Sequence, residues 1–259
     1  MILASASERR VNLLRQVGAV FETIPAEADE TLDGVTQPDG YVTELARRKA
    51  DAVSALIGRD AQSPDMYDHA IIIGADTVVV TGDGEILGKP EGRGDAARML
   101  RTLSGRWHEV YTGVALIEMR KTRRDKNGFG ADNAGADGAG ADNAETDCAG
   151  ADNAGADCAG TAASRDRAAG GIFRFADRIV GYEATRVKFC AINEAEINAY
   201  TDSGEPFGKA GAYAIQGAGS LFVERIEGCY ANVVGLPMRR LCYMLRAFGY
   251  DLFMTNILR

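Results

Sequence analysis

Apolar residues along the chain fall into two alternating patterns. The run at 71–80 is rich in β-branched side chains, which is typical of a buried strand, and we expect that strand over 70–80. Between 39 and 57, apolar residues recur three and four positions apart and share one face of a predicted helix. The same patterns predict strands over 2–4, 20–24, 107–118, 172–191 and 220–226, and helices over 8–17, 94–103, 194–203 and 236–248. This alternation predicts an α/β fold, with a mixed, twisted β-sheet flanked by helices.

A pentad repeat interrupts this pattern at 130–159, where the chain reads GADNA, GADGA, GADNA, ETDCA, GADNA and GADCA. The repeat has no aromatic or large aliphatic residue, so it cannot bury enough apolar surface to offset the entropy of ordering. We interpret about 121–170 as a flexible low-complexity insertion in one domain spanning 1–259, at the tip of a hairpin of two long strands. A weak cation-binding loop and an acidic segment that binds a basic protein are the alternatives.

Charge and composition narrow the classes of function. The net charge is −8, but residues 128–163 hold seven acids and no lysine or arginine, so the remainder carries only −1. A nearly neutral body does not indicate a surface for a nucleic acid polymer. No apolar run reaches the ~18 residues of a membrane span, and the first ten residues do not resemble a signal peptide. We therefore expect a cytoplasmic protein without a membrane partner.

The cysteines and histidines exclude several kinds of site. The five cysteines are scattered without a CxxC pair, which argues against a disulfide framework and a structural zinc site. With two histidines in the chain, a Ser-His-Asp or Cys-His device is poorly supported. Carboxylates, lysines and arginines must therefore carry any chemistry.

Asp76 is the first candidate for such chemistry. It lies in the middle of the apolar run, where a carboxylate is costly unless it is paired, hydrogen-bonded or bound to metal. Two small residues, Gly74 and Ala75, precede it and allow a close approach to the backbone. The alternative is an aspartate that merely caps or bends the strand.

Three further motifs favour an anionic ligand. In SASERR at 5–10, hydroxyls, free helix N–H groups and two guanidinium groups meet at a strand-to-helix junction, an arrangement that suits phosphate. In LGKP at 87–90, Gly88 and Pro90 would hold Lys89 at a loop edge. The glycine-rich stretch 204–219 contains Lys209 and Gln216, whose amide can hydrogen-bond a base edge. Taken singly, the motifs also fit an ordinary helix cap, a solvated loop lysine and a glycine-rich hairpin.

Together these motifs resemble the Maf family of nucleotide pyrophosphatases. Seven matching pieces run in family order: LASASERR at 3–10, ARRKA at 46–50, GADT at 74–77, GKP at 88–90, LSG at 103–105, KAGAYAIQG at 209–217 and VGLP at 234–237. The resemblance implies a Maf/ITPase-like fold and a cytosolic hydrolase that cleaves a nucleoside triphosphate to the monophosphate and pyrophosphate. It also implies a homodimer.

The resemblance assigns roles to individual residues. It implies that Asp76 is the proton acceptor and that Arg9, Thr77 and Gln216 set base preference, in the combination typical of the branch acting on dTTP and UTP. Other positions belong to the polar pocket of the family; of these we expect Ser7, Arg10, Lys49, Lys89 and Lys209 to bind phosphate. We expect Glu30 and Asp76 to hold a divalent cation, Mg²⁺ or Mn²⁺, because hard cations prefer oxygen ligands.

Two departures from the family pattern stand out. Gly208 replaces the usual aspartate before the lysine of KAGAY, which puts one acidic contribution to metal or water handling in doubt. Glu8 replaces the usual proline of SPRR, beside the expected phosphate site. Two other functions stay open, namely a housecleaning pyrophosphatase for modified nucleotides and a non-catalytic nucleotide-binding regulator of cell division.

Overall fold

The structure, a computed structural model, describes residues 1–32, 37–59, 67, 69–121 and 173–256. The expected insertion therefore lies almost entirely outside the described residues. The strands are β1 (Ile2–Leu3), β2 (Glu22–Thr23), β3 (His69–Thr81), β4 (Ile86–Leu87), β5 (Trp107–Lys121), β6 (Phe173–Phe189) and β7 (Val223–Glu227). The helices are α1 (Glu8–Gln16), α2 (Pro38–Arg59), α4 (Arg93–Leu103), α5 (Glu194–Asp202), α6 (Tyr230–Val234), α7 (Met238–Arg246) and α8 (Leu252–Asn256), with 3-10 turns η1 (Ala210–Ala212) and η2 (Ala218–Phe222).

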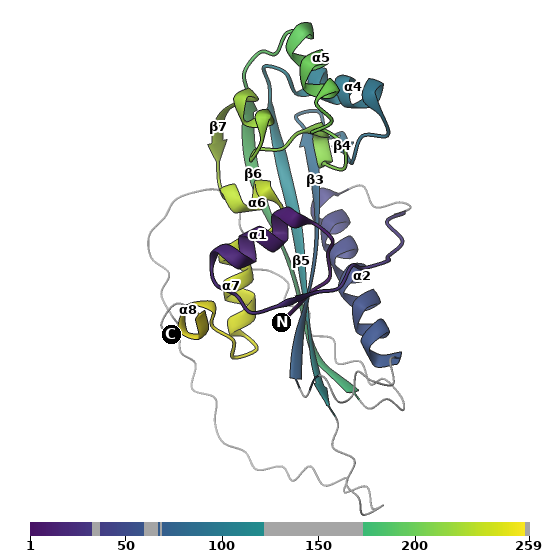
Figure 1. The fold of residues 1–259 in the computed structure, drawn as a ribbon, viewed down its shortest axis with the longest axis vertical. Helices are drawn as coiled ribbons and strands as arrows, with labels where there is room; N and C mark the ends of the chain where they lie inside the picture. The colour runs from purple at the N-terminus through teal and green to yellow at the C-terminus, as the bar shows by residue number, and fades with distance from the viewer. Residues whose placement is uncertain (33–36, 60–66, 68, 122–172, 257–259) are drawn as a thin grey trace, which may run out of the picture.

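One mixed sheet organises the described part of the chain (Figure 1). Its strand order is β2-β1-β3-β5-β6-β7, and β4 also pairs with β3. β1 runs parallel to β2 and β3, whereas the other pairs are antiparallel. The pairing of β5 with β6 confirms the long hairpin expected on either side of the insertion. The mixed sheet flanked by helices confirms the predicted α/β class.

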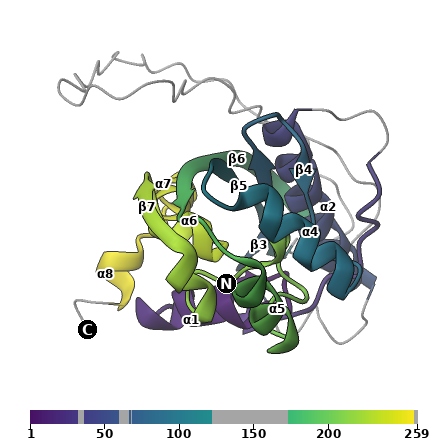
Figure 2. The ribbon, with the colours of Figure 1, turned by 90° about the horizontal axis from the view of Figure 1, so that it is seen from above.

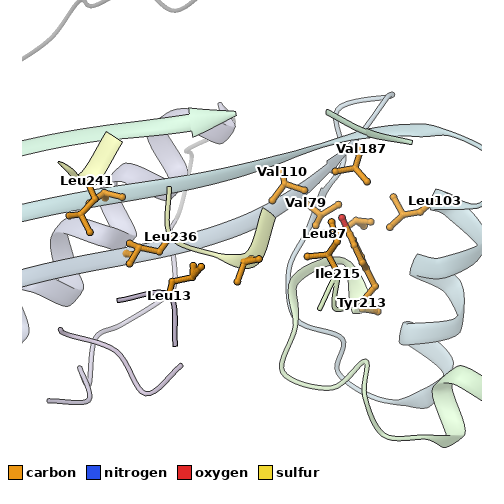
Figure 3. Close-up of a cluster of buried hydrophobic side chains, with 14 of the residues drawn as sticks. Leu13, Val79, Leu87, Leu103, Val110, Val187, Tyr213, Ile215, Leu236 and Leu241 are labelled. Atoms are coloured by element: carbon orange, nitrogen blue, oxygen red, sulfur yellow. The ribbon is translucent and has the colours of Figure 1, made fainter. Parts of the chain in front are cut away.

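The helix α2 covers one face of the sheet, and α1, α6 and α7 lie on the opposite side (Figure 2). The helix α4 packs in the same core as α1 and α7. On the second face, apolar side chains from β3, β5 and β6 pack with those of the helices (Figure 3). Successive residues of β3 serve opposite faces, since side chains alternate along a strand. Ile72 packs on the α2 side, and Ile73 packs in the core of the other side.

Two glycines let α2 lie directly on the sheet. A Cβ at Gly74 would sit 2.1 Å from the carbonyl oxygen of Ala46, and one at Gly113 would sit 2.2 Å from that of Val42. No side chain fits at either position without displacing the helix backbone. The lack of a side chain at Gly74 in β3 and at Gly113 in β5 therefore sets how closely α2 packs on the sheet.

One edge of β3 is open near its centre. β5 pairs with β3 along its whole length, so β1 and β4 must share the other edge. There β1 pairs with residues 72 and 73, and β4 with residues 79 and 80. Among the described strands, none pairs with this edge at 74–78, the segment that contains Asp76 and Thr77.

The elements that differ from the sequence-based expectations are short. The strand expected over 220–226 begins only at Val223, because 218–222 forms η2. The helix expected over 236–248 is α7. A separate helix, α6, precedes it and is followed by Gly235, whose φ of +124° favours glycine. The elements β4 and α8 were not predicted. Within the described residues, no helix combines the length and apolar character that crossing a bilayer requires.

Replacing Gly74 with Ala should destabilise the fold by about 2 kcal/mol or more, because the new methyl group overlaps backbone of α2. The matched control is Gly94→Ala in α4, where an added Cβ meets nothing within 4 Å. This control should change the free energy of unfolding by no more than about 1 kcal/mol. Urea unfolding of both variants measures the difference, and equal stabilities would contradict the packing described.

Acid should destabilise the protein through His108. This side chain is 1% exposed, its Nε2 lies 2.9 Å from the hydroxyl of Tyr213, and burial lowers its pKa to about 3. Between about pH 6.5 and pH 3 the unfolded chain binds a proton at this position and the folded chain does not, so stability falls as the pH falls. The loss approaches about 1.4 kcal/mol per pH unit. Urea unfolding from pH 7 to pH 4.5 should show a shallower pH dependence for His108→Gln than for the unsubstituted protein; parallel curves would contradict the assignment.

Candidate active site

The open edge of β3 borders a cavity of about 540 Å³. All ten site residues expected from the sequence line it, although they come from segments far apart in the chain. They are Ser7, Arg9, Arg10, Glu30, Lys49, Asp76, Thr77, Lys89, Lys209 and Gln216. Apolar side chains, among them Val79, Val110 and Ile215, form further parts of the wall.

Asp76 and Lys49 form a buried ion pair at the α2 side of this cavity. The Nζ of Lys49 lies 2.5 Å from Oδ1 of Asp76, and both side chains are about one-tenth exposed. The same Nζ lies 2.8 Å from Oε1 of Glu30, whose other oxygen lies 3.3 Å from Nζ of Lys89. Two carboxylates and two ammonium groups therefore alternate along the wall, with Lys49 between the carboxylates.

The charge of these lysines acts on Glu30. Partial burial would raise the pKa of its carboxyl group, but the hydrogen bonds and positive charges of Lys49 and Lys89 outweigh burial and leave the pKa below its ordinary value. Glu30 is thus a carboxylate at neutral pH and serves as the anion for both lysines.

On the other side of β3, Arg10 is held by three hydrogen bonds. Its Nε donates to the carbonyl oxygen of Gly235 at 2.7 Å, and its two terminal nitrogens donate to the hydroxyls of Ser5 at 3.2 Å and Thr77 at 3.1 Å. Burial lowers the pKa of Arg10, and the negative charge of Asp76 partly opposes that effect. Arg10, in α1, therefore contacts β3 and the residues that follow β1 and α6, at one wall of the cavity.

The first turn of α1 also faces the cavity. Ser7 occupies the N-cap position, as expected, but its hydroxyl makes no capping hydrogen bond among the described residues. No Ser7 side-chain hydrogen bond caps the N–H groups of that turn, which lies in the cavity wall with Arg9 and Arg10. Glu8, the departure from the family pattern, is exposed at the first helical position, where the helix dipole favours an acidic side chain.

The segments on either side of η1 contribute Lys209, just before it, and Gln216, between η1 and η2. Nζ of Lys209 donates to the carbonyl oxygen of Glu205 at 2.5 Å. Burial lowers the pKa of Lys209, and the charge of Arg9 lowers it further. Gly208, which replaces the usual family aspartate, lines the cavity with a φ of +71° and open space around it. At this point the cavity wall therefore lacks the carboxylate that the family usually has.

The cations of the cavity are only partly neutralised. Lys49 and Lys89 pair with carboxylates, whereas Arg9, Arg10 and Lys209 form no ion pair within the described part of the chain. Burial lowers the pKa of each of these three groups. A multiply charged anion that entered the cavity would offset their mutual repulsion and their desolvation.

The donor set can be compared with the needs of a divalent cation. The described residues contain no group of three or more His, Cys, Asp or Glu side chains placed to hold a metal by themselves. Glu30 and Asp76 nonetheless approach the same ammonium group, and Mg²⁺ is commonly held by one or two carboxylates together with substrate phosphates and water. The residues present therefore fit a cation that binds with a phosphorylated ligand.

Sequence reasoning missed residues that support the site from behind. Glu205 accepts hydrogen bonds from the N–H groups of Ala218 and Gly219 and from the hydroxyl of Tyr200. A Cβ at Gly217 would collide with the Glu205 side chain at 2.4 Å. The Glu205 carboxylate thus connects the start of the segment 205–219 to its end by hydrogen bonds. The acidic residue in the glycine-rich stretch was the available signal.

Replacing Glu205 with Gln should loosen the segment that carries Lys209 and Gln216. An amide has one oxygen, so it cannot accept from Tyr200 and both backbone N–H groups with the geometry of the carboxylate. The loss should be about 1–2 kcal/mol of local stability, seen as faster amide exchange at 218 and 219. Asp202→Asn, at the exposed end of α5, is the control and should leave that exchange unchanged. Unaltered exchange in Glu205→Gln would contradict the role.

Comparison with known proteins gives a consistent result. The family model described as "Maf-like protein" matches residues 1–177 and 173–248. A protein of Pelotomaculum thermopropionicum named dTTP/UTP pyrophosphatase is 39% identical, with 97% of each chain covered. Proteins with the same name from Caldicellulosiruptor bescii and Bacillus anthracis are each 37% identical, with 97% of this chain and 96% of theirs covered. The chain, in which six of the seven collinear motifs contribute residues to one cavity, belongs to the Maf family.

Proposed function

We propose that the protein hydrolyses nucleoside triphosphates, preferably dTTP and UTP, to the nucleoside monophosphate and pyrophosphate. The observation that carries the proposal is a single cavity in which a buried carboxylate, Asp76, lies among cationic side chains from four separate segments. The names of the relatives, dTTP/UTP pyrophosphatase, support the reaction and the substrates. The near-complete coverage of those relatives leaves no large part of their chains unmatched.

The cations are suited to a triphosphate, which carries about four negative charges near neutral pH. Arg10 and Lys209 have no carboxylate partner among the described residues, so they would meet the phosphates directly. Lys49 and Lys89 would do so in exchange for Glu30. Ser7 would contribute its hydroxyl and the adjoining N–H groups of α1.

Asp76 would act as the proton acceptor. The oxygen of a water molecule bonds to the α-phosphorus, the bond from that phosphorus to the oxygen bridging to the β-phosphorus breaks, and pyrophosphate leaves with the electron pair. The proton of the water passes to Asp76. Lys49 binds Oδ1 of that carboxylate, which orients the side chain and leaves Oδ2 for the water. The surrounding cations stabilise the negative charge that develops on the leaving group.

A divalent cation, Mg²⁺ or Mn²⁺, is part of the proposal. Glu30 and Asp76 would hold it together with the phosphates of the substrate. Such an ion polarises a phosphoryl oxygen and neutralises charge on the leaving group. Lys49 now lies between the two carboxylates, so the ion would have to share or replace its contacts.

The base would be held by Arg9, Thr77 and Gln216. Uracil and thymine present two carbonyl acceptors and one N–H donor along the same edge. A guanidinium group offers donors to the carbonyls, and the amide of Gln216 can supply both a donor and an acceptor. All three residues line the cavity that holds Asp76.

Two other functions are tested by the same assays. A housecleaning enzyme would release pyrophosphate faster from modified than from ordinary nucleotides. A non-catalytic regulator would bind nucleotide without releasing pyrophosphate. Gly208, in place of the usual family aspartate, gives this alternative some weight. The homodimer implied by the family stays a prediction.

Replacing Asp76 with Asn should lower kcat for dTTP at least about 100-fold, because the amide cannot accept the proton of the attacking water. Binding of a non-hydrolysable dTTP analogue should change by only a few-fold. Asp83→Asn, in the exposed turn after β3, makes the same chemical change outside the cavity and should leave kcat unchanged. Pyrophosphate release and calorimetric binding measure both effects. Nearly normal turnover in Asp76→Asn would reject this role.

A further inference from the structure

A line of hydrogen bonds runs from the cavity into the core through Thr77. Thr77 and Thr112 are paired across β3 and β5, so their side chains lie on the same face of the sheet. Their hydroxyl oxygens are 2.9 Å apart. Thr112 is fully buried, and its hydroxyl also lies 3.0 Å from the backbone carbonyl oxygen of Asn232 in α6. Thr77, which lines the cavity, is therefore connected by a hydrogen bond to Thr112, which does not line it.

The direction of each hydrogen bond follows from the number of protons. A carbonyl oxygen only accepts, so Thr112 must donate its single proton to Asn232. Thr112 then has no proton for Thr77, and the hydroxyl of Thr77 must donate to Thr112. A guanidinium group only donates, so Thr77 accepts from Arg10. The Thr77 hydroxyl thus has no proton left and keeps one lone pair for a ligand.

This direction is held in place from the far side. The Nδ2 of Asn232 donates to the carbonyl oxygen of Val110 at 2.8 Å and to the hydroxyl of Thr185 at 3.0 Å, and Asn232 is 0% exposed. These contacts fix α6 against β5 and β6, and with it the carbonyl that Thr112 must serve. Water does not reach Thr112 to supply an alternative partner, because the side chain is fully buried.

We propose that Thr112 is a positioning residue for specificity, which makes Thr77 present only a hydrogen-bond acceptor to the cavity. The inference rests on the proposed function, in which Thr77 contacts the base. An acceptor at this point binds the N3–H of uracil or thymine. It opposes the N3 lone pair of cytosine, since two acceptors cannot share a hydrogen bond. Selection for keto pyrimidines is therefore set partly by a side chain that the nucleotide never touches.

Thr112→Val tests the proposal, because valine has nearly the same shape but no hydroxyl. The freed proton of Thr77 can then turn toward the ligand, and the carbonyl of Asn232 keeps the N–H of Gly235 at 3.0 Å as a partner. The ratio to measure is the dissociation constant of a non-hydrolysable CTP analogue divided by that of the matching UTP analogue. We expect this ratio to fall about tenfold in Thr112→Val. Thr112→Ser, which keeps the hydroxyl, should retain the ratio of the unsubstituted protein.

Thr185→Val is the matched control. It also removes a buried threonine hydroxyl that contacts Asn232, but Asn232 keeps its hydrogen bond to the carbonyl oxygen of Val110, and the contact between Thr77 and Thr112 stays intact. It should lower stability without changing the ratio. Gln216 is present in every variant, so its own effect on the ratio cancels in the comparison. If Thr112→Val fails to fold, Thr112→Ala makes the same test.

The outcomes separate this proposal from the proposed function. An unchanged ratio in Thr112→Val, or an equal fall of the ratio in Thr185→Val, would overturn the positioning role of Thr112 and leave the proposed reaction unaffected. Analogue binding with the expected change of ratio, but no pyrophosphate released from UTP or dTTP, would overturn the reaction alone. Failure of the unsubstituted protein to bind either analogue would overturn both.

Discussion

The close packing of α2 on the sheet is the constraint on which the site depends. Gly74 and Gly113 admit backbone of the helix where any side chain would collide with it. Lys49 therefore reaches a carboxylate that belongs to the strand beneath, at 2.5 Å. A buried ion pair is weak evidence for stability, because removing both charges from water costs about as much as their attraction returns. The physical reason to keep one here is chemical, since the carboxylate and the ammonium group both face a cavity.

The interrupted edge of β3 explains how that cavity receives side chains from both faces of the sheet. A strand paired on both edges would separate Asp76, which points toward α2, from Thr77, which points toward α1 and α6. At 74–78 the edge between β1 and β4 is open among the described strands, so both residues border the same space. In the proposed function these adjacent residues would take different parts, one near the phosphates and one near the base, without a long loop.

Much of this arrangement could be predicted from local sequence. The run that became β3 and the helical spacing that became α2 are long enough for their periodicity to identify them. Two-residue strands such as β4 have no periodicity, and the break between α6 and α7 depends on Gly235 and Pro237 inside an apolar segment. Nine of the ten residues expected at the site lie in the collinear motifs, Glu30 lies outside them, and all ten line one cavity.

The supporting residues could not be found in that way. Thr112 and its partner Asn232 are 120 positions apart, and nothing near either residue in the chain indicates the other. Glu205 also contacts residues 13 and 14 positions away, across two turns. Polar contacts of this kind follow from the path of the backbone, so they become visible only once the sheet and its helices are assembled.

The charges of the cavity suggest how it is prepared for a ligand. Glu30 neutralises Lys49 and Lys89, and these contacts hold both ammonium groups at the wall. Glu30 is also about half exposed, so it can turn away at a smaller cost than a fully buried group. In the proposed function, a triphosphate that binds both lysines would take the place of Glu30 and leave its carboxylate free beside Asp76. The same exchange that binds the phosphates would therefore expose the pair of carboxylates to a cation that arrives with them.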